Sequence, residues 1–165
     1  MIISNSSPLI HLTKLGKLEY LINKEKEILI PTAVFNEVVI EGKKNNYNES
    51  YIIENYINEG KISVNKLNKL KVSFYPPLGK GEVEALELAK QKNIPLIIDD
   101  RKARNFAQLT NIEFQTTIAT IFELLISKCI NYIEYKANIK RLAENGWISA
   151  DIIQEFLDKG EQYGR

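Results

Sequence analysis

The first ten residues of the chain, MIISNSSPLI (residues 1–10), run from a short apolar stretch directly into a helix start. The pattern predicts a buried strand over residues 1–4 and a helix over residues 6–16, with serine at its cap, Pro8 at its first position and Gly16 at its end. A strand that leads straight into a helix N-terminus gathers backbone N–H groups and side chains at its carboxyl end, as α/β folds do. Asn5 stands at this junction, where catalytic α/β proteins often carry a carboxylate.

Strands and helices continue to alternate after this junction. Further short strands are predicted over residues 27–31, 61–65, 94–100 and 112–114. Helices are predicted over residues 32–42, 49–60, 79–93, 101–110, 116–128, 132–146 and 149–160. This order predicts a three-layer α/β fold, with a short, mainly parallel central sheet and two extra C-terminal helices. The default site of such a fold lies at the carboxyl ends of its strands.

Composition restricts the class of protein. The 165 residues, 44% of them hydrophobic, are enough for one ordinary core, so we expect one compact domain. No apolar run approaches the roughly 20 residues of a membrane span, and the first residues lack a signal-peptide pattern. The sequence therefore predicts a cytoplasmic protein without a membrane partner. Its single cysteine excludes an intrachain disulfide and a multi-cysteine metal site.

The net charge of +1 hides one local imbalance. Residues 61–80 contain five lysines and no acid, with Phe74 and Tyr75 among them. Such a segment would suit a polyanion. A solvated strand and loop explains it equally simply, and we favour that interpretation.

Two adjacent carboxylates, Asp99 and Asp100, close the apolar strand over residues 94–100. One of them can serve as the N-cap of the helix that follows. The other then needs a cation or a shifted pKa, because two neighbouring carboxylates repel each other. We expect the carboxyl end of this strand to lie beside that of the first strand, which brings Asp100 to the same edge of the sheet as Asn5.

Two glutamates fall on apolar faces of predicted helices. Glu82 shares a face with alanines and a leucine, whereas Glu84 and Glu87 are expected in solvent. Glu37 also has apolar helical neighbours, and a carboxylate in such a place is costly unless it is paired or binds a metal. Two simpler explanations stay open: helix-dipole stabilisation for Glu82 and a surface lysine partner for Glu37.

The side-chain oxygens of Asn5, Glu37, Glu82 and the Asp99/Asp100 pair are expected to point inward from distant segments. Together they form a set of hard oxygen ligands. Such a set suits Mg²⁺ or Mn²⁺ better than zinc, since the chain has one histidine and no cysteine cluster. That histidine, His11, is expected to be an ordinary surface or core residue. The chain has neither of the common Gly-rich phosphate loops and offers no clear Ser-His-Asp arrangement.

Four stretches in this order resemble the PIN-domain superfamily: IISNSSPLIHLTKLGKLEYL, ILIPTAVFNEV, GKGEVEALELAKQKN and LIIDDRKARNFA. The closest branch is the DUF3368 family, related to the VapC-type toxins. The resemblance covers roughly residues 1–130, which predicts a nuclease domain over that range and a helical extension packed on it over residues 131–165. It implies a metal-dependent nuclease fold in which acids at strand ends hold Mg²⁺ or Mn²⁺.

The resemblance also implies roles for individual residues. Asn5, Glu37, Glu82 and Asp100 take the metal positions, with Asp99 as the competing choice for Asp100. The four acids of this set are the expected catalytic groups. Supporting hydroxyls are expected at Ser6, Thr116 and Thr117, and contacts to a nucleic-acid backbone at Arg101 and Arg104. The chain departs from the family pattern in two respects. Residue 5 is an amide, which supplies no charge and should lower metal affinity, and the further acid that many relatives carry after the last strand is missing.

These observations lead to a functional hypothesis with one main alternative. The chain is expected to be a metal-dependent endoribonuclease, the toxin of a toxin-antitoxin pair, with RNA and a small antitoxin protein as partners. The alternative is a PIN-like module with little or no catalysis that binds nucleic acid or protein. A receiver-like signalling protein fits less well, because receivers carry their acidic pair after the first strand. Apolar residues in the last two helices, with Trp147 between them, predict a homodimer.

Overall fold

The computed structural model describes residues 1–67, 69–70, 75–144 and 148–163. They form two compact units, Met1–Gln115 and Thr116–Arg165. The first unit holds the sheet, and the second is helical. The boundary between the units lies before residue 130, where the sequence predicts the end of the nuclease domain. The reason is that the helix that starts the second unit packs with the helices that follow it.

The described residues form one sheet of five parallel strands, in the order β3-β2-β1-β4-β5. The strands are β1 (Ile2–Ser4), β2 (Ile28–Pro31), β3 (Ile62–Asn65), β4 (Leu96–Ile97) and β5 (Phe114–Gln115). In the central strand β1, Ile3 pairs with Leu29 of β2 on one side and with Leu96 of β4 on the other. The chain first moves outward from β1 to β3 and then returns to the other side of β1. The connections therefore change direction between β1 and β4.

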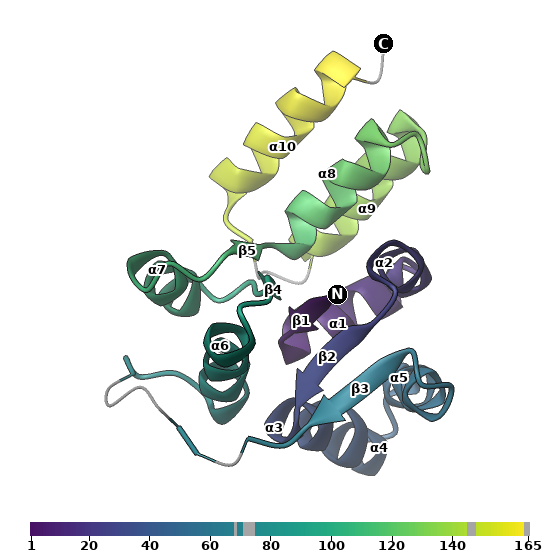
Figure 1. Ribbon diagram of the computed structural model, residues 1–165. Helices are drawn as coiled ribbons and strands as arrows, with labels where there is room; N and C mark the ends of the chain where they lie inside the picture. Colours follow the sequence, from purple (N-terminus) through teal and green to yellow (C-terminus); the bar gives the residue numbers. More distant parts are fainter. Residues whose placement is uncertain (68, 71–74, 145–147, 164–165) are drawn as a thin grey trace. The chain divides into compact units, whose positions relative to one another are not determined.

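Helices cover both faces of this sheet (Figure 1). One group follows β1 and β2 and comprises α1 (Ser6–Lys14), α2 (Leu18–Glu25) and α5 (Asn48–Asn58). The other comprises α6 (Lys80–Lys92), which follows β3, and α7 (Arg101–Leu109), which follows β4. Helix α1 contacts α5, and α6 contacts α7, β1, β2 and β4. Right-handed crossovers that run in opposite directions place the two groups on opposite faces.

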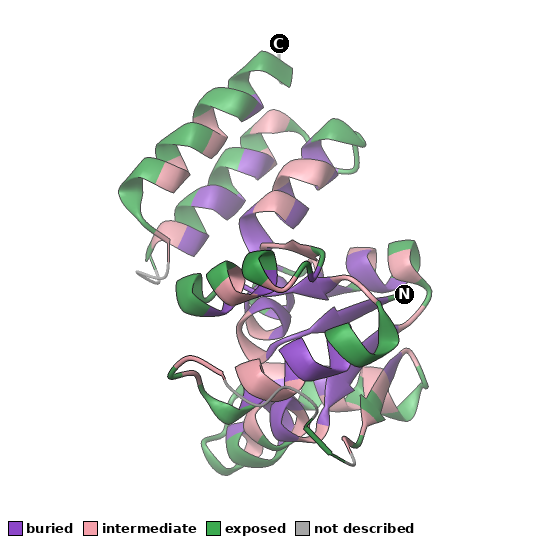
Figure 2. Cartoon of the chain, turned by 60° about the vertical axis from the view of Figure 1, so that its left-hand side comes forward, coloured by how far each residue is buried: buried purple, intermediate pink, exposed green. Residues whose placement is uncertain are grey.

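The core follows from strand alternation. Alternate strand residues, Ile3, Leu29 and Leu96, pack with buried residues of α6 and α7, including Leu86 and Ala103. Figure 2 shows the strands buried throughout most of their length, between helices whose outer sides are exposed. This arrangement confirms the predicted α/β fold with a short parallel sheet.

One predicted helix differs in its course. The segment after β2 was predicted to form one regular helix over residues 32–42. It starts after Pro31 and continues through α3 (Thr32–Phe35), a π-helical turn η1 (Asn36–Glu41) and α4 (Gly42–Lys44). A Cβ atom at Gly42 would lie 2.0 Å from the hydroxyl oxygen of Ser50, so this glycine permits close packing with α5 instead of ending a helix. Helix α2 was not predicted.

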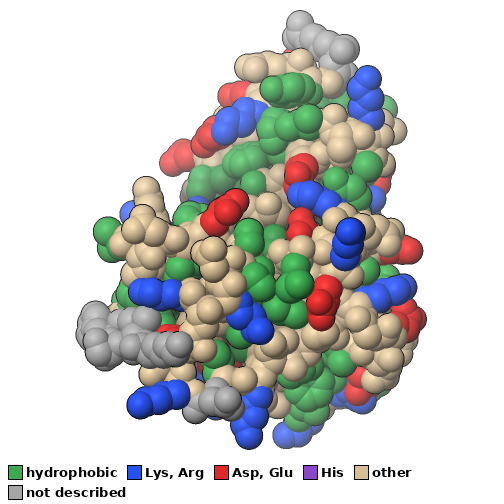
Figure 3. Space-filling view, viewed as in Figure 1, with side chains coloured by type: hydrophobic (Ala, Val, Ile, Leu, Met, Phe, Trp, Pro, Cys, Tyr) green, Lys and Arg blue, Asp and Glu red, His purple; other side chains and the backbone are tan. Residues whose placement is uncertain are grey.

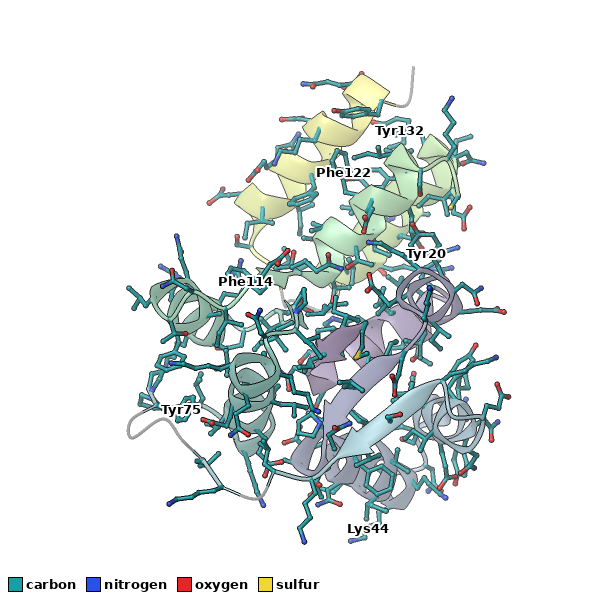
Figure 4. The ribbon with its side chains drawn as sticks, in the orientation of Figure 1. Tyr20, Lys44, Tyr75, Phe114, Phe122 and Tyr132 are labelled. Atoms are coloured by element: carbon teal, nitrogen blue, oxygen red, sulfur yellow. The ribbon has the colours of Figure 1, made fainter. Side chains whose placement is uncertain are left out.

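The second unit consists of α8 (Thr117–Ile126), α9 (Tyr132–Glu144) and α10 (Ala150–Tyr163), which contact one another. The buried Tyr135 of α9 donates a hydrogen bond from its hydroxyl to the carbonyl oxygen of Phe156 in α10, at 2.6 Å. Phe122 of α8 packs edge-on against Phe156, with 5.8 Å between the ring centroids (Figure 4). The predicted apolar stripes thus contribute to a local core, although Ile133 of α9 is 78% exposed. Trp147 lies outside the described residues.

Among the described residues, no helix is long and apolar enough to cross a membrane.

Candidate metal and catalytic site

The candidate site lies at the carboxyl edge of the sheet, where β1 and β4 run side by side. Asn5 directly follows β1, and its backbone N–H donates to the carbonyl oxygen of Ile97 at 3.1 Å. Asp99 and Asp100 follow the same strand, β4. The expected placement of Asn5 and Asp100 at one end of the sheet is therefore confirmed. This is the point where the connections change direction, which is the usual ligand position in α/β sheets.

Asn5 connects the end of β1 to the first turn of α6. Its side-chain Nδ2 donates a hydrogen bond to Oε1 of Glu82, at 3.1 Å. Asn5 is only 1% exposed, and its Oδ1 is buried without a hydrogen-bond partner among the described residues. A buried acceptor in this state is costly unless a donor or a cation reaches it.

Glu37 approaches the same helix from η1. It accepts a hydrogen bond from the hydroxyl of Ser6, which follows Asn5. A Cβ atom at Gly81 would lie 2.8 Å from Glu37 Oε2, so the absent side chain leaves room for this carboxylate beside α6. Because Gly81 precedes Glu82, the carboxylates of both glutamates approach the start of α6. A π-helical turn, such as the one that carries Glu37, is often found at functional sites.

The two aspartates have separate partners. Asp100 is the N-cap of α7, and its Oδ1 accepts a hydrogen bond from the backbone N–H of Ala103 at 2.8 Å. Asp99 Oδ2 lies 3.3 Å from Nδ1 of the buried His11. The expected capping acid is Asp100. For the other acid the sequence predicted a cation or a shifted pKa, and the structure places His11 beside Asp99.

Sequence reasoning gave no role to His11, although the pair joins α1 to the end of β4. One signal was present. His11 shares its helix face with Pro8, three positions before it, and Leu15, four positions after it. Both are also buried, and this spacing indicates an inward side chain.

The expectation that Glu84 and Glu87 stay in solvent is wrong. Glu84 Oε2 accepts a hydrogen bond from the backbone N–H of Ala33 at 2.9 Å, because α3 packs against α6. It thereby satisfies a free N–H in the first turn of α3, where the helix dipole also favours a negative charge.

Glu87 is fully buried. It accepts hydrogen bonds from the hydroxyl of Tyr75 and from the side-chain amide of Gln91. The ring of Tyr75 packs on Phe106 of α7, with 5.0 Å between centroids (Figure 4). Burial and the hydrogen bond to Glu87 raise the pKa of the Tyr75 hydroxyl. The segment before α6 therefore covers a helix face that the sequence pattern assigned to solvent.

The remaining predicted residues lie on two helices. Arg101 is exposed at the start of α7, and Arg104 is partly buried, with an Nε atom that has no hydrogen-bond partner among the described residues. Thr116 and Thr117 belong to the second unit. Thr116 caps α8 by accepting from the backbone N–H of Ala119 at 3.3 Å, and Thr117 is buried.

The side chains at this edge of the sheet offer oxygen ligands to a divalent cation. No group of three or more His, Cys, Asp or Glu side chains in the described parts of the chain is arranged to hold a metal. Glu37, Glu82 and the amide oxygen of Asn5 nevertheless supply hard oxygen ligands from neighbouring positions, and the amide oxygen is buried with no hydrogen-bond donor in the described part of the chain. Mg²⁺ commonly takes only one or two carboxylates in a protein and keeps several waters. The donor chemistry therefore fits a Mg²⁺-like ion and gives no support for zinc.

Comparisons with known proteins give a family match. A family model described as "DUF3368: PIN domain" matches residues 1–162. This match extends past residue 130 and includes α9 and most of α10, which the sequence resemblance had placed outside. Among solved structures, "a domain of a functionally unknown protein from Methanocaldococcus jannaschii DSM 2661" is 21% identical, with 70% of this chain and 89% of that chain covered and a TM-score of 0.47. A search of curated proteins found no match.

Proposed function

We propose, because this chain belongs to the DUF3368 family of PIN domains, that it is a Mg²⁺- or Mn²⁺-dependent endoribonuclease. The PIN fold is a nuclease-type fold, and PIN domains generally use divalent metals and typically bind nucleic acid. The observation that carries the proposal is the pairing of Asn5 with Glu82 at the carboxyl edge of the sheet, with Glu37 beside the adjacent residues Ser6 and Gly81. The amide oxygen of Asn5 is buried there and has no donor among the residues that the structure describes.

Each residue of the site has a defined part in this proposal. Glu37, Glu82 and the amide oxygen of Asn5 would hold the cation, with Asp99 or Asp100 as a further ligand. When bound, such an ion supplies charge to offset that of a phosphodiester and lowers the pKa of a water. Ser6 orients the Glu37 carboxylate through its hydroxyl, and His11 orients Asp99. Glu82 or Asp100 would orient the attacking water.

A nucleic acid as the substrate is supported by the charges around this edge. Arg101 and Lys102 are exposed at the start of α7, which begins at the site. Several Lys and Arg side chains gather along the edge of the first unit that is lowest in Figure 3, towards which the arrowheads of β2 and β3 point in Figure 1. Lys44 lies on this edge (Figure 4). Such side chains contact phosphates without reading sequence. Phe74 of the lysine-rich segment lies outside the described residues. Of the described lysines there, Lys66, Lys69 and Lys80 are exposed and Lys61 is partly buried.

The test is cleavage of a labelled, mixed-sequence RNA pool by the full-length protein, in MnCl₂ and in EDTA. Cleavage is expected in Mn²⁺ alone, and Glu82→Gln should abolish it. Glu113→Gln is the matched control, because Glu113 is exposed at the amino end of β5, at the opposite edge of the sheet. Cleavage that persists in EDTA, or in the Glu82→Gln protein, would contradict the proposal. Tight RNA binding without cleavage would instead identify a non-catalytic PIN-like module.

The physiological role that we propose is that of a toxin held inactive by a small antitoxin protein. Induced expression of the wild-type chain in a bacterial host should slow growth, whereas the Glu82→Gln chain should not. Equal growth of the two strains, at equal protein levels, would contradict a toxin role while leaving the nuclease activity to the cleavage assay.

We also propose that the chain forms a homodimer through its second unit. The highly exposed Ile133 on α9 supports this, since a large apolar side chain in that position is well suited to an interface. Light scattering at tens of micromolar should give a dimer for the wild type and a monomer for Ile133→Lys. Lys140→Ala, at an exposed position of the same helix, is the control. A monomeric wild type would overturn the dimer.

A further inference from the structure

The hydrogen bond between Asn5 and Glu82 fixes the orientation of the Asn5 amide. A carboxylate only accepts hydrogen bonds, so the NH₂ group of Asn5 must face Glu82 Oε1, and the 3.1 Å contact is of this kind. The carbonyl oxygen Oδ1 must then point elsewhere. It is buried and has no donor among the described residues. The same side chain therefore satisfies one acid of the site and leaves one oxygen available.

We propose that Asn5 keeps the site assembled without a cation, so that the folded state of the first unit does not depend on metal occupancy. In this role Asn5 is a positioning residue for Glu82, in addition to the metal ligand of the proposed function on which the Mn²⁺ part of the test rests.

A carboxylate of the same shape in place of the Asn5 amide would reverse the effect of this contact. Aspartate at residue 5 would place two carboxylates in contact, at a position that is only 1% exposed. Without a cation between them, like charges in so little water repel strongly. An acid at the N-cap of α1 would gain from the helix dipole, but the Asn5 side chain makes no capping hydrogen bond there. We expect the repulsion to be the larger effect.

The chain allows an isosteric exchange as the test. In the Asn5→Asp protein the contact between residues 5 and 82 has two carboxylates, and in the Glu82→Gln protein it has two amides. The double variant again has one amide and one carboxylate, with the donor at residue 82 and the acceptor at residue 5. Asn55→Asp, at an exposed position in the middle of α5, is the control for the substitution itself. Thermal unfolding of the full-length proteins is measured in EDTA and in MnCl₂.

In EDTA, Asn5→Asp should lower the Tm by roughly 5 °C or more, and the double variant should recover most of this loss. Asn55→Asp should stay within about 2 °C of the wild type. In MnCl₂, the Tm of the Asn5→Asp protein should rise by more than that of the wild type, because a cation can then bridge the two acids. If Asn5→Asp is too unstable to purify, recovery of a folded protein in the double variant serves as the same test.

Two outcomes would overturn the assembly role: an Asn5→Asp protein as stable as the wild type in EDTA, or a double variant no more stable than Asn5→Asp. The EDTA comparison contains neither metal nor RNA, so it stands whatever the cleavage assay gives. If the EDTA pattern holds but Mn²⁺ raises none of the melting temperatures, the role of Oδ1 as an ion ligand is overturned, and the metal-dependent function with it.

Discussion

Helix α6 carries two inward glutamates with opposite surroundings. Glu87, in its second half, is fully buried, and its two carboxylate oxygens accept from Tyr75 and Gln91. Glu82, in its first turn, is partly exposed, and its partner Asn5 has an oxygen that no described residue satisfies. One carboxylate is part of a closed hydrogen-bond network, and the other belongs to an open one.

This difference distinguishes a structural acid from a candidate functional acid. A buried carboxylate that receives donors on both oxygens stabilises the packing around it and has little capacity left for a ligand. A carboxylate beside an unsatisfied acceptor keeps that capacity. By burial alone, Glu87 would be the candidate functional acid. When hydrogen-bond partners are also considered, Glu82 is the candidate.

The largest expected effect is on catalysis. Glu82→Gln should lower RNA cleavage in Mn²⁺ by at least about a hundredfold, because it removes a charge at the proposed site. Glu87→Gln should leave cleavage within a few-fold of the wild type at temperatures where the protein is folded. Initial cleavage rates at 25 °C provide the measurement. A large loss of activity in Glu87→Gln with an unchanged Tm would remove the distinction between the two acids.

The next effect is on stability and has the reverse pattern. Glu87→Gln introduces an NH₂ group into a place where Tyr75 and Gln91 already donate, so one donor loses its acceptor. The free energy of unfolding should fall by roughly 1–3 kcal/mol. Glu82→Gln keeps an oxygen for the Asn5 amide and should cost less than about 1 kcal/mol. Urea unfolding measures both, and equal losses would contradict the comparison.

A smaller effect is expected from Gly81→Ala. The added Cβ meets the end of the flexible Glu37 side chain, which can move away, and alanine favours a helix by up to about 1 kcal/mol. Stability should therefore change little, while Mn²⁺ affinity by calorimetry should fall about tenfold.

Gly160→Ala in α10 is the matched comparison. Its Cβ would lie 2.2 Å from a ring atom of the buried Tyr135, so this variant should lose stability and keep its Mn²⁺ affinity. Unchanged Mn²⁺ affinity in Gly81→Ala would show that Glu37 is not a ligand.

The smallest effect concerns alkaline pH. The folded protein raises the pKa of Tyr75 above its ordinary value of 10.0, through burial and the bond to Glu87. Above pH 10 the unfolded chain therefore loses this proton while the folded protein keeps it, so stability falls as the pH rises. Burial also raises the pKa of Tyr135. This residue therefore adds a second contribution to the loss of stability at alkaline pH.

Tyr75→Phe removes one of these contributions. Its free energy of unfolding should decline less steeply between pH 9 and pH 11.5 than that of the wild type, although its stability at pH 8 is lower. Urea unfolding across this range is the measurement. A parallel decline in the two proteins would mean that Tyr75 titrates normally and that the network around Glu87 is weaker than its geometry indicates.

The sequence by itself determined the order of the elements and the edge at which the site lies. Apolar runs that end at Asn5 and at Asp99 gave the ends of two strands, and the strand–helix alternation gave a parallel sheet. The sequence did not predict helix α2, and it predicted a regular helix for the segment that forms the π-helical turn with Glu37. The four ordered motifs also gave the family, which the match over residues 1–162 confirms.

Only the tertiary structure decided the partners. That Glu87 is buried beneath Tyr75, that Glu84 caps α3 and that His11 reaches Asp99 could not be predicted, since each pair joins side chains from separate elements. Periodicity reports which side of one helix is apolar, and it does not report which other segment covers the polar side. Strand ends and helix faces are local properties of the chain. A hydrogen-bond partner is determined only when distant segments pack together.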